Sequence, residues 1–546
     1  MARLKHICSL EKLLCLATLL FAVLFDSTAA AQPYRPELKI VASNETVAVS
    51  WPLAAYYYAL VTNRNLESPV LWGGAATASK DFSSPWQYGL GLGSNLKVVT
   101  NVVGEEVVFN ATPTNAQMFY GMVPARIPIC QFAVFYDGLL EFSTAPTLVF
   151  NGPIHANGDI YTGTSTEHLF YKTVTTCGSI SSPAWNGHGP DWTNTGTFSA
   201  AVPFVTNVAP LKVLMGTNAL SLHVMTNLHG LIEMPPLGED PNSEMGRTRY
   251  YNYAQVVLLV SNTTVSVRIQ VPPDANMPPG ADPAPIILVT NLTGATNFPF
   301  LTVTNTFTDQ REHKLVKTTQ IDLGKYKIWL STNSLLLGKF PVGSYPTILY
   351  VADNRTNTSA TMTAIRITNG ISILNYGSLG FTLATPNPLY VWGNYNCTNA
   401  SYLYTTNTAA AAPSALICDA LTILSSAWKD SASVLTYSSR TASAATTVNA
   451  AFITGNVSST GSNTNEFSGG VQNLPRLLED WGASSLWLNT SFICLYQSII
   501  ATNQLVWPGT PGMYYNPPSR KFSFDQNFAS PAKLPPGTPF VGVPSD

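Results

Sequence analysis

The chain has 546 residues, and at roughly 150 residues per domain this length predicts about three to four domains. Its 28 basic and 30 acidic residues give a net charge of −2, and charged residues make up only 11% of the chain, against ~25% in a typical globular protein. The lack of a basic surplus argues against nucleic-acid binding. A content of 45% hydrophobic and 11% aromatic residues excludes a disordered chain. With 37 Gly and 39 Pro, the composition favours strands and turns.

The N-terminus has the pattern of a secretory leader. Arg3, Lys5 and Lys12 precede an apolar run, residues 13–25, and a small-residue cleavage motif follows it. The run is shorter than the ~20 apolar residues that span a bilayer, so we expect a cleaved signal peptide over residues 1–31. No later stretch has the length of a transmembrane segment. We therefore expect a secreted protein of the periplasm or cell surface, with no membrane span after signal cleavage.

Cysteine usage gives little information about the fold. Five cysteines follow the predicted leader: Cys130, Cys177, Cys397, Cys418 and Cys494. An odd number at wide spacing fits neither a disulfide framework nor a zinc site. We expect buried free thiols, and the alternative of one bridge between Cys397 and Cys418 stays open.

Residues 37–123 contain short alternating strands separated by Gly, Asn and Pro. The predicted strands lie at residues 38–41, 46–52, 57–61, 106–109 and 118–123. Such strands and turns indicate a small β-sandwich. The runs VSWP, VTNRNLESPVLW and MFYGMV resemble fibronectin type III-like modules of secreted bacterial proteins. The resemblance implies a spacer or adhesion module, and we assign no chemistry to it.

Short apolar strands that end at Gly or Asn corners recur through the rest of the chain. They lie within residues 132–142, 148–163, 168–180, 387–396, 414–428 and 449–457. A coiling parallel β-solenoid needs such strands, because each turn buries its inward residues against the next. We therefore predict two solenoid parts, residues 127–182 and 347–530, with an ordinary antiparallel sandwich as the alternative.

A different module is expected between the two solenoid parts. Residues 183–346 are predicted to form an α+β insert with a hairpin at residues 254–271 and one helix at residues 319–330. The predicted buried side of this helix is Ile321, Ile328 and Trp329. The Pro-rich residues 531–546 are expected to form an extended surface tail.

An acidic loop is the candidate metal site. Glu239, Asp240, Asn242 and Glu244 place oxygen ligands close together in a Pro/Gly-rich segment, as Ca²⁺ prefers. The spacing is not that of an EF-hand. The alternative is a loop that caps itself, with Glu244 paired to a nearby arginine, and we expect no other cofactor.

A charged cluster is the candidate catalytic site. Asp309, Arg311, Glu312, His313 and Lys314 lie together in a chain that has few charges elsewhere. A carboxylate pair with an arginine is suited to a lyase or hydrolase that acts on polysaccharide. The alternative is a structural salt-bridge cluster between the insert and the solenoid.

Aromatic and charged residues near the C-terminus are candidates for carbohydrate binding. Arg476, Glu479, Asp480 and Trp481 lie within six residues, and aromatic faces such as those of Trp392 and Trp481 stack on sugar rings. The alternative is a short helix stabilised by an ion pair between Arg476 and Asp480.

A histidine and an aspartate share one predicted corner. His155 and Asp159 lie four residues apart in NGPIHANGDIY, where they could act as a base and its orienting group. We prefer the interpretation that this is an Asn/Gly-rich turn in which His155 makes a structural hydrogen bond.

Residues 129–539 resemble a family of large secreted bacterial proteins related to PilX-like pilus-assembly components. The motifs that carry the resemblance are FNGPIHANGDIYTG, GEDPNSEMGRTRYYN, TDQREHKLVKTTQIDLGK, LYVADNR, NPLYVWGNYN and SGGVQNLPRLLEDW. The resemblance implies an exported, surface- or pilus-associated protein with no known cofactor. The chain departs from true pilus subunits in its predicted cleavable signal, which implies an accessory component.

The leading hypothesis is therefore a non-catalytic structural or adhesion protein whose partners are envelope or pilus proteins. Two alternatives remain: a polysaccharide lyase or hydrolase of β-solenoid architecture, and a non-catalytic carbohydrate-binding protein.

Overall fold

The computed structural model describes residues 38–42, 47–52, 58–63, 99–103, 106–111, 119–124, 126–142, 148–163, 168–187, 198–200, 204–215, 223–271, 284–340, 346–442, 444–460, 468–506 and 509–544. Strands dominate these ranges, and the two largest sheets contain twelve and seven strands. The prediction of a mainly β protein is confirmed. The predicted signal peptide, residues 1–31, lies outside the described residues. Within the described ranges, no helix has the length and apolarity needed to cross a bilayer.

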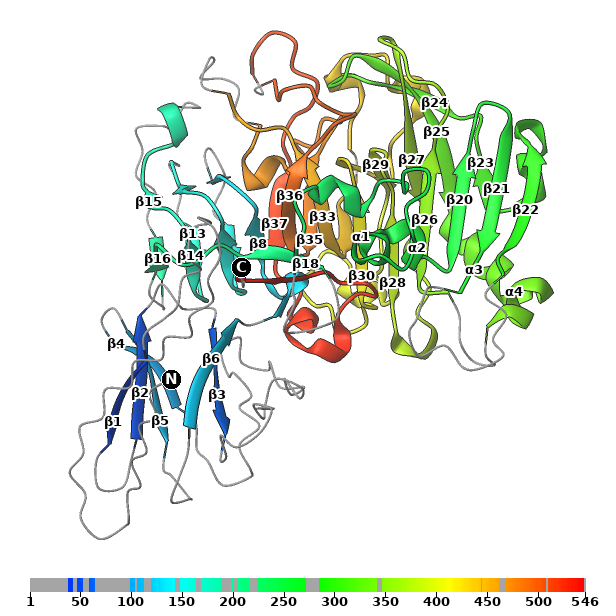
Figure 1. The fold of residues 1–546 in the computed structure, drawn as a ribbon. Coiled ribbons are helices and arrows are strands. Elements are labelled where there is room, and N and C mark those ends of the chain that lie inside the picture. Colours follow the sequence, from blue (N-terminus) through cyan, green and yellow to red (C-terminus); the bar gives the residue numbers. More distant parts are fainter. Residues whose placement is uncertain are drawn as a thin grey trace.

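The N-terminal region contains two small antiparallel sheets (Figure 1). The first sheet has the order β1-β2-β5-β4, with β1 (Lys39–Ala42), β2 (Val47–Pro52), β5 (Glu106–Ala111) and β4 (Val99–Val103). The second sheet pairs β3 (Tyr58–Asn63) with β6 (Phe119–Pro124). The five predicted strands are confirmed within one or two residues at most ends, and β4 is an additional strand that the sequence pattern missed.

The chain then passes repeatedly through three parallel sheets. One sheet contains β8 (Val134–Tyr136), β11 (Ile154–Ala156), β14 (Val174–Thr176) and β17 (Phe204–Val205). A second contains β10 (Leu148–Phe150), β13 (His168–Phe170) and β16 (Phe198–Ala200). The third contains β9 (Leu140–Glu141), β12 (Ile160–Tyr161) and β15 (Ile180–Ser181).

Strands β8, β11 and β14, which belong to three successive turns of the chain, follow one another at a regular spacing that the sequence analysis did not predict. Val134, Ile154 and Val174 pair directly, so equivalent residues lie 20 positions apart. The corner after each strand requires close approach of the backbone, because a Cβ on Gly158 would lie 2.7 Å from the carbonyl carbon of Gly138. Glycine at this corner therefore allows consecutive turns to stack in register.

The C-terminal half of the chain builds a second set of parallel strands. Six of them belong to the twelve-stranded sheet: β20 (Val256–Val260), β26 (Ile348–Asp353), β28 (Phe381–Ala384), β30 (Ser414–Cys418), β33 (Ala451–Asn456) and β36 (Phe492–Gln497). The seven-stranded sheet contains β23 (Leu301–Thr302), β24 (Thr306–Asp309), β25 (Lys314–Asp322), β27 (Thr361–Thr368), β29 (Leu389–Trp392), β31 (Leu421–Leu424) and β34 (Pro475–Arg476). A further parallel sheet contains β32 (Thr446–Asn449), β35 (Ser485–Asn489) and β37 (Ser519–Ser523).

The two sets of turns join in the middle of the largest sheet. β36 pairs in parallel with β8, so Phe492 lies opposite Val134 and Cys494 opposite Tyr136. Figure 1 shows β8 and β36 side by side. The first turn of this body thus stacks on its last. Of the twelve strands, the ten from β17 to β20 in the sheet order form a parallel stack roughly 45 Å high at ~4.8 Å per strand, and β21 and β22 extend it by antiparallel pairing that begins at β20.

The predicted α+β insert, residues 183–346, is not a separate module in the described residues. The hairpin at residues 254–271 is confirmed as β20 and β21 (Thr264–Ile269), and β22 (Ile286–Asn291) continues it. However, β20 pairs in parallel with β26, and β25 pairs in parallel with β27 over eight residues. These strands extend the sheets of residues 347–530, so the predicted boundary at residue 346 is wrong.

The predicted helix begins later than expected. Residues 314–322 form strand β25, because their alternating apolar residues pair with β27, and α3 covers Leu323–Thr332. The side chain of Asp322 caps this helix by accepting a hydrogen bond from the backbone nitrogen of Lys325. Ile321 and Trp329 are buried as predicted, whereas Ile328 is 63% exposed because it lies on the outer side of α3.

The C-terminal segment is not a surface tail. β38 (Phe540–Gly542) pairs with both β18 (Lys212–Met215) and β7 (Ile127–Pro128), and Val541 is fully buried. Proline in this segment limits strand length but leaves the carbonyl groups free to accept hydrogen bonds. Other short elements include β19 (His223–Val224), η4 (Leu228–Leu231), α1 (Glu244–Thr248), α2 (Tyr250–Tyr253) and α4 (Ser334–Lys339).

The five cysteines after the predicted leader are free thiols in the structure, and all of them except the half-buried Cys177 are buried. Burial raises the pKa of Cys130 and Cys418 to about 12 and that of the half-buried Cys177 to about 11. Because the thiolate is the reactive form, we expect little reaction with a thiol reagent at mildly alkaline pH in the native protein. In the chain from Gln32 to Asp546, a disulfide-exchange assay should count five thiols only after unfolding, and Cys177 should react first. Rapid native labelling of all five would contradict this packing.

Candidate functional site

The charged cluster predicted as catalytic is buried in the turn between β24 and β25. Asp309, Arg311 and Glu312 are each less than 5% exposed. Asp309 Oδ1 accepts hydrogen bonds from the backbone nitrogens of Arg311 and Glu312, at 2.8 and 3.0 Å. Its Oδ2 accepts one from the Tyr390 hydroxyl at 2.6 Å. Burial, reinforced by the charge of Glu312, raises the pKa of Asp309.

Glu312 connects this turn to two other parts of the chain. Its Oε1 lies 2.6 Å from Arg476 Nη1, and its Oε2 accepts from the backbone nitrogens of Thr502 and Asn503. Arg311 Nε donates to the carbonyl of Asn503 at 3.0 Å. Since all four carboxylate oxygens of Asp309 and Glu312 already accept hydrogen bonds, the geometry favours the structural alternative for this cluster.

The acidic loop predicted for Ca²⁺ does not gather its oxygens around one point. Glu239 forms an ion pair with Arg249 at 2.6 Å, and Asp240 accepts from the backbone nitrogen of Asn242. Glu244 instead contacts His223. Across the described ranges, no three or more His, Cys, Asp or Glu side chains are placed to share a metal ion. The loop therefore caps itself and pairs with its neighbours.

The two tryptophans predicted to bind sugar differ in exposure. Trp481 is 0% exposed, so the interpretation of its ring as a sugar platform is wrong. Apolar packing from residues distant in sequence encloses it, which a local pattern does not reveal. Trp392 is half-buried, and the guanidinium of Arg366 lies over its ring, 4.9 Å from the centroid. That face of Trp392 is therefore occupied by a cation–π contact.

The corner with His155 and Asp159 is structural, as preferred from the sequence. His155 is fully buried, and its two ring nitrogens lie 2.9 Å from Thr175 Oγ1 and from Asn157 Oδ1. Burial lowers the pKa of His155 to about 4. Asp159 accepts from the backbone and hydroxyl of Ser179 on the next turn. Both side chains thus hold successive turns together.

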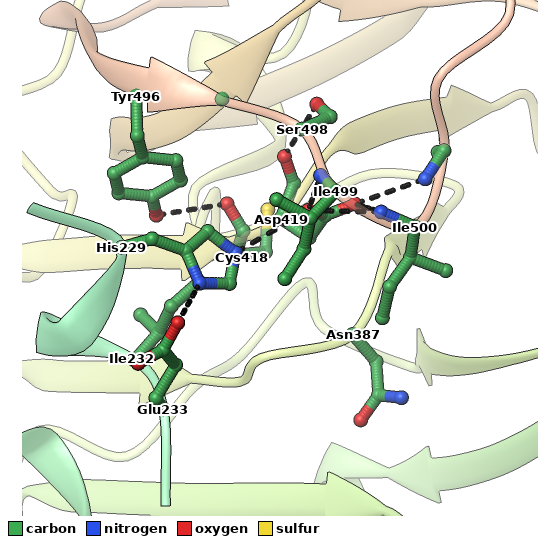
Figure 2. A network of polar contacts seen from close by, with 12 residues as sticks. His229, Ile232, Glu233, Asn387, Cys418, Asp419, Tyr496, Ser498, Ile499 and Ile500 are labelled. Carbon is green, nitrogen blue, oxygen red and sulfur yellow. Dashed lines mark hydrogen bonds and ion pairs between the residues drawn. The ribbon is translucent and has the colours of Figure 1, made fainter. Parts of the chain in front are cut away.

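A network that the sequence analysis did not single out centres on His229 of η4. Figure 2 shows this ring between two carboxylates. Nδ1 lies 2.9 Å from Glu233 Oε1, and Nε2 lies 3.4 Å from Asp419 Oδ1. The ring packs edge-on against Tyr496, whose hydroxyl donates to the carbonyl of Cys418 at 3.0 Å.

Asp419 lies between β30 and β31 and is fully buried. Its carboxylate accepts hydrogen bonds from three consecutive backbone nitrogens, those of Ile499, Ile500 and Ala501, at 2.6, 3.2 and 3.1 Å. Its backbone carbonyl accepts from the Ser498 hydroxyl at 2.8 Å (Figure 2). One aspartate thus fixes the loop after β36 to the neighbouring turn, since a carboxylate can accept about four hydrogen bonds.

The electrostatics of the network favour a charged imidazole. Burial by itself lowers the pKa of His229, but the hydrogen bonds and charges of Asp419 and Glu233 outweigh this effect and raise it overall. Both ring nitrogens contact carboxylates, so neither is free to exchange a proton with a substrate. The arrangement fastens η4 to the main sheet. Two sequence features pointed to it: the four-residue spacing of His229 and Glu233, and a lone aspartate in the apolar run ICDALTIL.

An open recess of about 420 Å³ contains one residue of the predicted carbohydrate site, Glu479. Trp428, Lys429 and Arg440 also line it. Glu479 is 1% exposed and accepts hydrogen bonds from the hydroxyl and the backbone nitrogen of Ser425, at 2.6 and 2.7 Å. Burial raises its pKa to about 7, although the bonds from Ser425 lower it in part. Aromatic, cationic and carboxyl groups therefore meet at this recess.

Replacing Glu479 with glutamine should change how stability depends on pH. The folded-state pKa of about 7 exceeds the ordinary value of 4.5. The stability contributed by the protonated carboxyl is therefore fully present below about 4.5 and is lost as the pH rises through about 7. In Glu479→Gln, both bonds to Ser425 can form without ionisation. We expect the melting temperature of the variant to rise relative to that of the wild type across this window. If the melting temperatures of variant and wild type change in parallel with pH, the raised pKa of Glu479 is contradicted.

The structure thus brings Asp309, Arg311 and Glu312 together with Arg476, and it separates Trp481 from any surface. Glu479 lines the recess, whereas Asp480 bonds to Asn516. Comparisons with protein-family models, with curated proteins and with solved structures find no match to this chain.

Proposed function

We propose that the chain is an exported structural and adhesion protein of the cell surface or of a pilus, without catalytic activity. Its body is a parallel β-solenoid, and its N-terminal sheets form a fibronectin type III-like sandwich that acts as a spacer. The observation that carries the proposal is the in-register pairing of β8 with β36, which joins two sets of turns into one parallel stack. Such a stack is a rigid rod that presents an extended surface.

Buried polar side chains support this interpretation because they stabilise stacking between turns. Asn396 and Asn449 each donate a side-chain hydrogen bond to the other's backbone carbonyl, at 2.8 and 2.9 Å. Asn489 continues the ladder by donating to Asn449 Oδ1 at 2.9 Å. Buried ladders of this kind fix the register of neighbouring turns. Asp419 and Glu312 likewise connect separate parts of the chain, so these buried polar groups stabilise the scaffold.

Export is supported by the leader pattern of residues 1–31 and by the low charge of the chain. The motif resemblance to PilX-like pilus-assembly components supports a context of envelope or pilus proteins as partners. An accessory role follows from the predicted cleavage of the leader, since a polymerising pilus subunit keeps its N-terminal helix.

A carbohydrate-binding role, with or without cleavage, is the second candidate. It is favoured by the recess in which Trp428, Arg440 and Glu479 meet. Aromatic rings stack on sugars, and paired carboxylate and guanidinium groups bind hydroxyls. A polysaccharide fits this combination of groups better than a nucleic acid, because the chain has no basic surplus.

The test uses the purified chain from Gln32 to Asp546 with a panel of polysaccharides, with and without Ca²⁺. Both retention on the polymer and release of new reducing ends are measured. In parallel, a strain that lacks the protein is assayed for surface attachment. We expect impaired attachment and no new reducing ends. Release of reducing ends would replace the proposal with an enzyme, and normal attachment together with retention on polymer would favour the carbohydrate-binding candidate.

A further inference from the structure

A cavity of about 140 Å³ lies where the first turn of the main body meets the last. The segment that follows β8, the end of β33 and strand β36 line it, and their polar residues include Asp137, Asn456 and Gln497. β8 and β36 form this junction at the centre of the large sheet (Figure 1). The cavity is separate from the recess that contains Glu479, because the two share no lining residue.

Glu141, the last residue of β9, lines this cavity and is 1% exposed. Its Oε2 and the hydroxyl of Tyr136, which also lines the cavity, are buried and have no hydrogen-bond partner among the described residues. β9 is held between β12 and a bridge to Gly470. A Cβ on Gly469 would lie 2.7 Å from Glu141 Oε1, so the backbone at Gly469 approaches the carboxyl group closely. The backbone therefore encloses Glu141 closely.

The environment of Glu141 favours binding of a positive charge. An ionised carboxylate that is buried without a partner costs free energy. Burial accordingly raises the pKa of Glu141 to about 7, although a hydrogen bond from Ser459 lowers it in part. The carboxyl group thus ionises near neutral pH, where a cation placed at Oε2 lowers the free energy of the charged form.

The donor set distinguishes between kinds of cation. Ca²⁺ takes six to eight oxygen ligands. Asp137, the other carboxylate at this cavity, already forms an ion pair with Lys212 at 3.0 Å. An ammonium group has three N–H donors and needs only a few acceptors. These donors suit the unpartnered oxygens of Glu141 and Tyr136.

We propose that this cavity binds a small organic molecule through a protonated primary amine, with Glu141 as its counter-charge and Tyr136 as a hydrogen-bond acceptor. This binding site is independent of the proposed surface role, since it lies at the junction of turns and not in the recess with Glu479.

The first test compares n-butylamine with 1-butanol, which have nearly the same size and differ in the amine. Binding to the full chain is measured by calorimetry. We expect the amine to bind at least about tenfold more tightly than the alcohol. Its affinity should fall as the pH drops below about 7, because Glu141 becomes protonated. Equal affinities, or binding that is insensitive to this pH change, would overturn the proposal.

Variants then locate the site. Glu141→Gln should abolish amine binding, and Tyr136→Phe should weaken it. Glu479→Gln is the matched control, because Glu479 is also buried with a raised pKa but lines the other recess. Unchanged amine binding in Glu141→Gln, or binding of Ca²⁺ that Glu141→Gln removes, would overturn the proposal. If Glu141→Gln fails to fold, as shown by reactive thiols, Tyr136→Phe and the wild-type pH dependence decide.

Discussion

Replacing Arg476 with methionine should lower the free energy of unfolding by about 3–5 kcal/mol. Arg476 is the cation that contacts Glu312, at 2.6 Å, and the side chain of Glu312 is fully buried. Without the guanidinium, the carboxylate loses its ion-pair partner and remains in the interior, bonded to the backbone nitrogens of Thr502 and Asn503. Methionine keeps most of the apolar volume of the arginine side chain, so the expected loss of unfolding free energy measures the effect of removing its charge. Urea unfolding followed by tryptophan fluorescence measures it.

A double variant and a surface pair provide the controls for this prediction. Arg476→Met combined with Glu312→Gln should recover a large part of the lost stability, because the buried charge is then absent. Lys212→Met breaks an ion pair with Asp137 whose side chains are 33% and 20% exposed, and it should cost no more than about 1 kcal/mol. Similar losses of unfolding free energy for Lys212→Met and Arg476→Met would show that burial does not increase the contribution of the ion pair between Arg476 and Glu312.

Removal of the Asp419 carboxylate should have the second largest effect, about 3 kcal/mol. In Asp419→Ala, the backbone nitrogens of Ile499, Ile500 and Ala501 lose their acceptor, and His229 loses one of its two carboxylates. The loop after β36 should then open more often. Urea unfolding measures the loss, and amide hydrogen exchange should accelerate most at these three residues.

The same variant should lower the pKa of His229, because Asp419 is the first group that counteracts its burial. Nuclear magnetic resonance of labelled histidine follows this pKa. Asp240→Ala is the control, since Asp240 is exposed and accepts from a backbone nitrogen within its own loop. It should cost less than about 1 kcal/mol. An unchanged His229 titration in Asp419→Ala would refute the described network.

Several features of the fold could be predicted from local patterns. The hairpin of β20 and β21 was recognisable because alternating apolar residues flank a polar four-residue turn. The short strands β8, β11 and β14 were recognisable as three-residue runs that each begin with Val or Ile and end before a corner. Their 20-residue spacing was also present in the sequence, in Gly138, Gly158 and Gly178. It escaped notice because strands of three residues give weak periodicity.

The candidate sites were harder to predict because burial depends on residues far apart in the sequence. Trp481 and Asp309 look the same in sequence whether they face solvent or the core, and the structure buries both. Asp419 gave a visible hint, a carboxylate within an apolar run. The backbone nitrogens that donate to this carboxylate, those of Ile499, Ile500 and Ala501, lie 80 to 82 residues further along the chain. No local pattern specifies such a pairing.

The sequence by itself determined that this is a mainly β protein of low charge, because composition and short-range alternation decide strand formation. The tertiary structure alone decided that β8 lies against β36, that β20 and β25 extend the same sheets, and that β38 joins β7 to β18. Strand pairing is chosen by the fit of whole apolar faces and by shared backbone hydrogen bonds. These are properties of two segments together, and neither segment contains them alone.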